Sequence, residues 1–286
     1  MNVKILADSA SDLTDTYYEQ YDIDRASLTV HLHGKEYKDG AEITPKTVYD
    51  AMKEGADTKT SQVSPQTFQT IFTSYMEKEQ PLVYLAFSSE LSGTYQTAKM
   101  VEQEIKEEHP EAPIHVVDLK CASLGYGLAV IRAAKLAQEG ATTEEIIDMA
   151  LYHAQHMEHI FTVDDLEYLY RGGRVSKTAA FVGSLLKIKP ILHVEDGKLV
   201  PLEKIRGSKK VLHRMLEIME DRGIDLENQV IGINHGDDLE RAEELATMIK
   251  DKFGAKKVII EMIGSVIGAH TGPGTIGLYF LNKPYK

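Results

Sequence analysis

The strongest constraint on the fold is a regular alternation between short apolar runs and longer amphipathic segments. The apolar runs at residues 3–7 and 82–87 have the length of buried strands. Helices are predicted over residues 45–53 and 65–77, each with Pro at its first position. Strands that alternate with helices indicate parallel βαβ units. Residues 1–160 are therefore predicted to form a three-layer α/β/α domain with a parallel sheet.

The pattern changes near residue 160, and residues 161–286 are predicted to form a two-layer α+β domain. Apolar runs at residues 188–194 and 199–205 flank the dipeptide Asp196-Gly197, which is a strong signal for a tight β-hairpin. Helical segments and further short strands follow this hairpin. Hairpins mixed with helices favour a sheet with helices on one side.

The composition excludes several classes of function. The 286-residue chain has a net charge of −12, which argues against a nucleic-acid-binding protein. The single cysteine, Cys121, excludes an internal disulfide and suits a reducing compartment, and we interpret it as a small buried residue. We interpret His153, His156 and His159 as a solvated helix end rather than a zinc site. Asp8 breaks the first apolar run after a few residues, so we expect no signal peptide. Because no apolar window approaches about 18 residues, we expect no membrane span. We therefore expect a cytoplasmic location.

Common catalytic and cofactor motifs are incomplete. The segment that starts Gly125-Tyr126-Gly127 resembles a dinucleotide fingerprint but has Val130 where Gly or Ala is needed. Residues 172–178 resemble the end of a phosphate-binding loop but have Ser176 where Gly is required. There is no GxSxG nucleophile elbow. We therefore expect no cofactor and no metal.

Hydroxyl and glycine clusters remain, at residues 60–65, 88–94 and 270–277. In sheets of parallel strands, ligands bind beyond the carboxyl ends of the strands, and hydroxyls with free N–H groups at helix starts bind anions. Any one of these serines could simply cap a helix. Taken together with the Gly- and Pro-rich segment that follows His270, the clusters predict an anion-binding site.

Seven segments, in order along the chain, resemble the DegV family, the fatty-acid-binding subunits of bacterial fatty acid kinase. They are Ala7-Asp8-Ser9 to Asp12-Leu13, Thr60-Ser61-Gln62 to Ser64-Pro65, Ser88-Ser89 to Gln96, Leu166 to Ser176, Ile188-Lys189-Pro190-Ile191-Leu192, Arg206-Gly207 and His270-Thr271-Gly272-Pro273-Gly274. Two positions depart from the family pattern: Val63 replaces a common Pro, and Cys121 replaces a frequent hydroxyl.

The resemblance implies a carrier, not an enzyme, that buries an acyl chain and holds its carboxylate near the domain interface. A separate ATP-dependent kinase subunit would phosphorylate the carboxylate, and the acyl phosphate would feed phospholipid synthesis. The residues implied at the carboxylate are Thr60, Ser61, Ser92, Gly93, Thr94, His270 and Thr271. Arg174 and Arg206 would contact the kinase or the acyl phosphate. Residues expected along the acyl tunnel are Phe161, Val163, Leu166, Leu185, Leu186 and Ile191.

Two other functions are compatible with the same residues. Ser92 and His270 could form a nucleophile–base pair in an acyl transferase or thioesterase, or the turns could bind a small polar anion. The charge is also uneven, because residues 171–214 contain eleven Lys and Arg against three Asp and Glu. This stretch is either a solvated basic face or a docking surface for an acidic partner, an acyl phosphate or, transiently, an anionic membrane.

Overall fold

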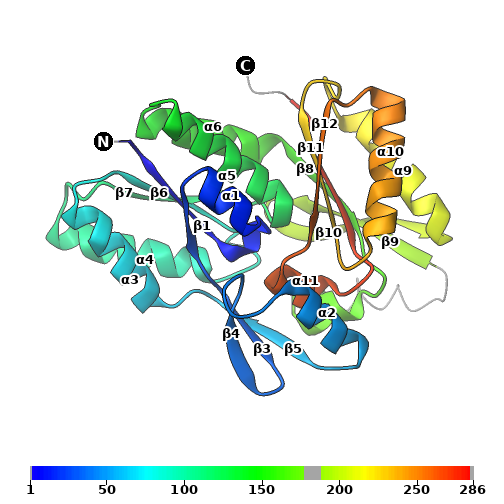
Figure 1. Ribbon diagram of the computed structural model, residues 1–286, viewed down its shortest axis with the longest axis horizontal. Helices are drawn as coiled ribbons and strands as arrows, with labels where there is room; N and C mark the ends of the chain where they lie inside the picture. The colour runs from blue at the N-terminus through cyan, green and yellow to red at the C-terminus, as the bar shows by residue number, and fades with distance from the viewer. Residues whose placement is uncertain (1, 177–187, 284–286) are drawn as a thin grey trace.

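A four-stranded parallel sheet forms the centre of the first domain in the computed structural model, which describes residues 2–176 and 188–283 (Figure 1). Its strands lie in the order β2-β1-β6-β7. Their bounds are Lys4–Asp8 for β1, Ile23–Ala26 for β2, Leu82–Ala86 for β6 and Ile114–Asp118 for β7. Because β1 pairs with β2 on one side and β6 on the other, the winding direction reverses there. Ligands commonly bind at such a reversal, beyond the carboxyl ends of the strands.

Helices cover both faces of this sheet, so the predicted three layers are confirmed. Helices α3 and α4 lie on one face, and α5 and α6 lie on the other (Figure 1). The bounds are Ser9–Ser11 for the 3-10 helix η1, Asp15–Gln20 for α1, Pro65–Glu77 for α3, Thr94–Glu108 for α4, Ser123–Gln138 for α5 and Thr143–His156 for α6. Ser64 accepts from the N–H of Thr67 and Thr142 forms a capping box with Glu145, so α3 and α6 begin at clear sequence signals.

A small antiparallel sheet extends from the first domain and was not predicted as a unit. Its strands lie in the order β4-β3-β5. Their bounds are Thr29–Leu32 for β3, Lys35–Lys38 for β4 and Thr58–Ser61 for β5, and helix α2 spans Pro45–Lys53 between β4 and β5. Strands β4 and β5 contain no fully buried residue, so they lack the apolar run that identifies a strand in the sequence.

The second domain is a mixed sheet in the order β10-β9-β8-β13-β11-β12, with only β11 and β12 parallel. Helices α9 and α10 cover its outer face, and α5 of the first domain packs on its inner face (Figure 1). The bounds are Met157–Thr162 for β8, Glu167–Arg171 for α7, Ile188–Glu195 for β9, Lys198–Arg206 for β10, Ser208–Arg222 for α9, Val230–His235 for β11, Leu239–Phe253 for α10, Lys257–Met262 for β12, Ser265–Thr271 for α11 and Ile276–Leu281 for β13. The predicted two-layer domain is thus confirmed. The boundary predicted near residue 160 falls within β8 and stays a prediction.

The hairpin β9–β10 turns at Asp196-Gly197 as predicted, with φ angles of 49° and 83°. Its tip is attached to the first domain. The buried Ser88 hydroxyl donates to the carbonyl of Gly197 at 2.8 Å, and the ammonium of Lys198 on β10 lies 3.5 Å from the carboxylate of Glu90. A Cβ at Gly197 would lie 2.5 Å from the Ser88 Oγ, so this contact requires glycine.

No helix among the described residues is long and apolar enough to cross a bilayer.

Candidate functional site

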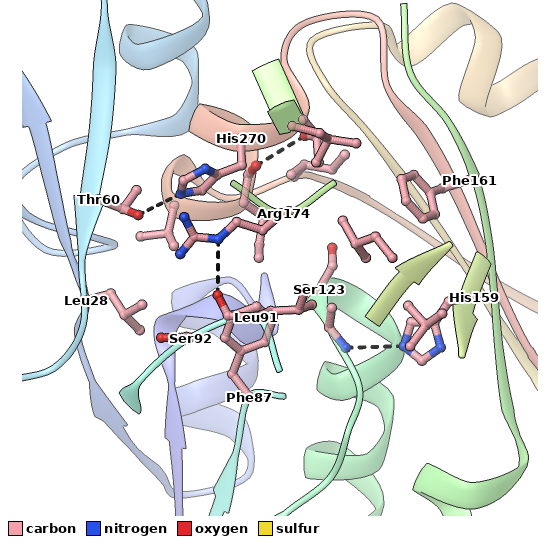
Figure 2. A pocket seen from close by; sticks show the side chains of 18 of the residues that line it. Leu28, Thr60, Phe87, Leu91, Ser92, Ser123, His159, Phe161, Arg174 and His270 are labelled. Atoms are coloured by element: carbon pink, nitrogen blue, oxygen red, sulfur yellow. Dashed lines mark hydrogen bonds between the residues drawn. The ribbon is translucent and has the colours of Figure 1, made fainter. Parts of the chain in front are cut away.

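A cavity of about 360 Å³ lies between the two domains, next to Phe87, the residue that follows β6. Polar side chains gather on one side of it, where Thr60, Ser92 and His270 lie, whereas Phe161 and His159 lie on the opposite side (Figure 2). The apolar part of the lining comprises Leu28, Phe87, Leu91, Ala122, Phe161, Leu169, Val194, Leu199, Ile263, Val266 and Ile267. The cavity therefore has apolar walls and a polar end, as small-molecule sites commonly do.

The polar end is built around a pair formed by Thr60 on β5 and His270 on α11. Thr60 Oγ1 and His270 Nε2 are 2.7 Å apart, although the two residues are 210 positions apart in the chain. Gly172 lies against the other edge of the ring, because a Cβ there would be 2.2 Å from Nδ1. Burial, with the nearby positive charge of Arg174, lowers the pKa of His270 to about 4. At neutral pH, His270 is thus an uncharged hydrogen-bonding group.

Arg174 brings a positive charge to the same end of the cavity. Its Nε donates to the carbonyl of Leu91 at 3.1 Å (Figure 2). Its Nη1 donates to the carbonyl of Gly172. Burial lowers the pKa of the guanidinium, but an arginine side chain keeps its charge in proteins. Held by two backbone carbonyls, this charge favours an anion near Thr60 and His270.

The turn before α4 supplies Ser92 and Gly93 to the cavity. Ser92 Oγ accepts from the N–H of Thr94 at 3.2 Å and lies 2.9 Å from Thr94 Oγ1. A Cβ at Gly93 would be 2.1 Å from the Gln62 Oε1, so any larger residue there would displace the Gln62 side chain. Gln62 is itself positioned by a hydrogen bond of 2.6 Å to Thr97. Thr94 is buried under this turn and does not line the cavity.

Two other predicted site residues line the cavity, and one does not. Ser61 Oγ lies 2.6 Å from His31 Nε2, and Thr271 Oγ1 donates to the carbonyl of Ile267 at 3.2 Å. Arg206 ends β10, where it is exposed and outside the cavity lining. The structure thus brings together Thr60, Ser61, Ser92, Gly93, His270, Thr271 and Arg174, and it leaves Thr94 and Arg206 outside the cavity lining. The roles assigned to all of them stay predictions.

The geometry does not support a nucleophile–base pair. His270 Nε2 contacts Thr60, whereas the Ser92 hydroxyl contacts Thr94. A histidine whose pKa is lowered to about 4 is also a poor base at neutral pH. Cys121 is buried as predicted, and burial raises the pKa of its thiol, which makes it inert. Among the described residues, no group of His, Cys, Asp and Glu could hold a metal ion.

The far end of the cavity contains residues that sequence reasoning missed. His159 lines the cavity, accepts from the N–H of Ala122 at 3.2 Å through Nε2, and has Nδ1 3.1 Å from the carbonyl of Met157. Burial lowers the pKa of His159 to about 4. His153 is buried as well, so the interpretation of these histidines as a solvated helix end is wrong for both. His153 lies on the buried face of α6, and His159 is buried because α6 ends at His156 and the chain continues as the buried strand β8.

A buried polar network lies beside His159 and joins the two domains. Ser123 donates to the carboxylate of Asp12 and accepts from the Nδ2 of Asn234. The hydroxyl of Tyr279 donates to the Oδ1 of Asn234 at 3.1 Å. Burial raises the pKa of Asp12. Ser123 and Tyr279 line the cavity, and their hydroxyls have partners within the protein.

The predicted tunnel residues divide into three groups. Phe161 lines the cavity. Val163, Leu166 and Ile191 are buried in the apolar clusters of the second domain and do not line it. Leu185 and Leu186 lie outside the described residues. Val194 and Leu199, on the two strands of the hairpin β9–β10, also form part of the wall and were not predicted.

The fold and the cavity define a two-domain α/β protein with a binding cavity between its domains. A family model described as the DegV family matches residues 2–283, and the chain belongs to this family. A DegV domain-containing protein of Clostridium perfringens is 41% identical over 280 residues, which cover 97% of this chain and 96% of that protein. A protein of Thermotoga maritima named fatty acid-binding protein is 36% identical, and the alignment covers 97% of this chain and 96% of that protein.

Solved structures agree with this family assignment. A fatty-acid-binding DegV family protein from Thermus thermophilus superposes with a TM-score of 0.87 at 30% sequence identity. The superposition covers 98% of this chain and 99% of that protein. A stearic acid-binding protein from Eubacterium ventriosum has a TM-score of 0.85 at 27% identity, with 97% of each chain covered. The expected DegV fold is thus confirmed, and relatives within the family bind fatty acids.

Proposed function

We propose that this protein is a fatty-acid carrier, which buries the hydrocarbon tail in the interdomain cavity and holds the carboxylate beside Thr60, Ser92 and His270. The observation that carries the proposal is a single cavity with apolar walls and one polar end. Fatty acid binding by relatives that cover nearly the whole chain supports it.

The tail supplies most of the binding free energy in this proposal. Burial of a methylene contributes about 0.8 kcal/mol, so a long acyl chain offers on the order of 10 kcal/mol as an upper bound. The polar end contributes orientation. Hydroxyl donors on Thr60 and Ser92, together with the charge on Arg174, favour an ionised carboxylate over the neutral acid.

A carrier of this kind prepares its ligand for a reaction that another protein performs. We infer that a separate ATP-dependent kinase subunit phosphorylates the bound carboxylate and that the acyl phosphate feeds phospholipid synthesis. Arg174 and Arg206 would contact that kinase or the acyl phosphate, within a basic stretch at residues 171–214. This stretch would also allow transient contact with an anionic membrane, and added salt would weaken either interaction.

Extraction and identification of the lipid bound to freshly purified protein tests the proposal directly. Native mass spectrometry should detect a protein with one fatty acid attached, which delipidation removes and added stearic acid restores. Protein that is always free of ligand and never binds added stearic acid would contradict the proposed function. Incubation of the loaded protein with a bacterial fatty acid kinase catalytic subunit and ATP then tests acyl phosphate formation.

A further inference from the structure

Resting on the proposed function, we propose that His159, packed against Tyr279, forms the end of the acyl cavity and sets the longest chain that this carrier accepts. Both side chains line the cavity, and His159 lies across it from Thr60 and Ser92 (Figure 2). A fatty acid whose carboxylate lies at Thr60 and Ser92 therefore directs its terminal methyl group towards this pair.

The pair is rigid. The His159 ring is fixed on both nitrogens, by the N–H of Ala122 and the carbonyl of Met157. The Tyr279 ring meets it edge-on, with centroids 5.4 Å apart and planes at 90°. Gly125 of α5 lies directly against both rings, because a Cβ there would be 2.5 Å from His159 Nε2 and 2.7 Å from Tyr279 Cδ1. Neither ring can turn aside for a longer chain without loss of these contacts.

A second cavity, of about 550 Å³, lies beyond this wall. Leu128 and Leu281 line it. Leu128 is one helical turn after Gly125 on α5, and Leu281 is two residues after Tyr279 on β13, so each continues the same face of its element. His153 also lines the second cavity and is close enough to His159 for the two to interact electrostatically. His159 and Tyr279 line only the first cavity, but residues close to them in the fold line the second.

The chemistry of the wall also restricts the end of the ligand. The polar atoms of His159, Ser123 and Tyr279 are already hydrogen-bonded within the protein. Burial keeps His159 uncharged at neutral pH. A terminal hydroxyl or second carboxylate would therefore lose its hydration without full compensation. The structure favours fatty acids that end in a plain methyl group.

Competition between saturated acids of increasing length tests this inference. Equal amounts of palmitic, stearic, arachidic and behenic acids are offered to delipidated protein, and native mass spectrometry measures which acids are retained. The wild type should retain acids up to a sharp limit. The variant His159→Ala shortens the side chain at the end of the cavity and should move the limit upward by at least one member of the series. Each extra methylene that becomes buried should improve retention about fourfold, hence about 15-fold for a two-carbon step.

Controls separate a structural defect from the proposed effect. His156→Ala removes a histidine three residues away that lines neither cavity and has Nδ1 3.0 Å from Asn282 Oδ1, so it should leave the limit unchanged. If His159→Ala fails to fold, His159→Asn shortens the side chain but keeps an acceptor for the N–H of Ala122.

Each outcome has a defined meaning. A wild type that binds no fatty acid contradicts the proposed function. A wild type that binds all four acids equally, a folded His159 variant with an unchanged limit, or an equal shift in His156→Ala would overturn the role of His159.

Discussion

Two adjacent glycines allow the polar end of the cavity to be perturbed with a built-in control. Gly172 has an ordinary backbone conformation, but a Cβ there would lie 2.2 Å from the Nδ1 and 3.0 Å from the Cε1 of His270. Gly173 has a φ of 74° and no heavy atom within 4 Å of its Cβ position. Gly172→Ala therefore adds a steric contact without backbone strain, and Gly173→Ala adds backbone strain without a steric contact.

The structure gives the size of the expected effect. Relief of the contact in Gly172→Ala requires the His270 ring to move by about 1 Å. Because Thr60 Oγ1 lies only 2.7 Å from Nε2 on the opposite edge of the ring, the ring cannot move straight away from residue 172 and must turn aside, which breaks the hydrogen bond between Thr60 and His270. The displaced pair would also no longer hold the carboxylate proposed beside it, and loss of one hydrogen bond to that charged ligand costs about 1.5–3 kcal/mol, which corresponds to roughly 10- to 150-fold weaker fatty acid binding. Gly173→Ala should cost about 1–2 kcal/mol of folding stability and leave the Kd within about twofold.

Displacement of a fluorescent fatty acid from delipidated protein measures the Kd, and the absence of tryptophan from the chain keeps the protein's own fluorescence low. Urea unfolding of both variants measures stability in parallel. Gly172→Ala with wild-type affinity, or Gly173→Ala with an equal loss of affinity, would refute the placement of the carboxylate beside His270.

Three further predictions concern other parts of the molecule. Thr60→Ala and Ser92→Ala should reduce acyl phosphate formation by the kinase more than they reduce fatty acid binding, and equal losses would count against their role at the carboxylate. Ser88→Ala leaves the carbonyl of Gly197 without its donor and should lower the free energy of unfolding in urea by about 1–3 kcal/mol; no change would mean that the hairpin tip is not held by this bond. Burial raises the pKa of Asp8 from 3.8 to about 6, so its contribution to stability is present below pH 4 and is lost as pH rises through 6. Relative to Asp8→Asn, wild-type stability should fall by up to about 3 kcal/mol between pH 4 and 7, and a rise over that interval would contradict a raised pKa.

Local signals predicted the regular elements better than the site. The helices α2 and α3 begin at Pro45 and Pro65, as predicted, because a proline at the first helical position and a hydroxyl cap before it are properties of a few adjacent residues. Asp196-Gly197 fixed the hairpin for the same reason.

The site depends on contacts between distant segments, which no local pattern reports. The sequence marked Thr60 and His270 as polar residues near turns, but they lie on strand β5 and helix α11, neither of which was predicted. Thr60 reaches the cavity because β5 pairs with β3. His159 was misplaced because the change from α6 to β8 alters which side chains point inward. Family resemblance supplied the polar end of the cavity, whereas its far end required the structure.

In a fatty-acid carrier, the attachment of the hairpin tip would link ligand binding to the contact between the two domains. Val194 and Leu199 on this hairpin form part of the cavity wall, while Ser88 holds its tip to the first domain. A bound acyl chain would touch the hairpin β9–β10 as well as the first domain. Because the ligand would bind best when the hairpin tip is attached to the Ser88 loop, ligand binding would favour that attached state. A partner that contacts both the hairpin and the loop that holds it would thereby distinguish loaded from empty protein without touching the ligand.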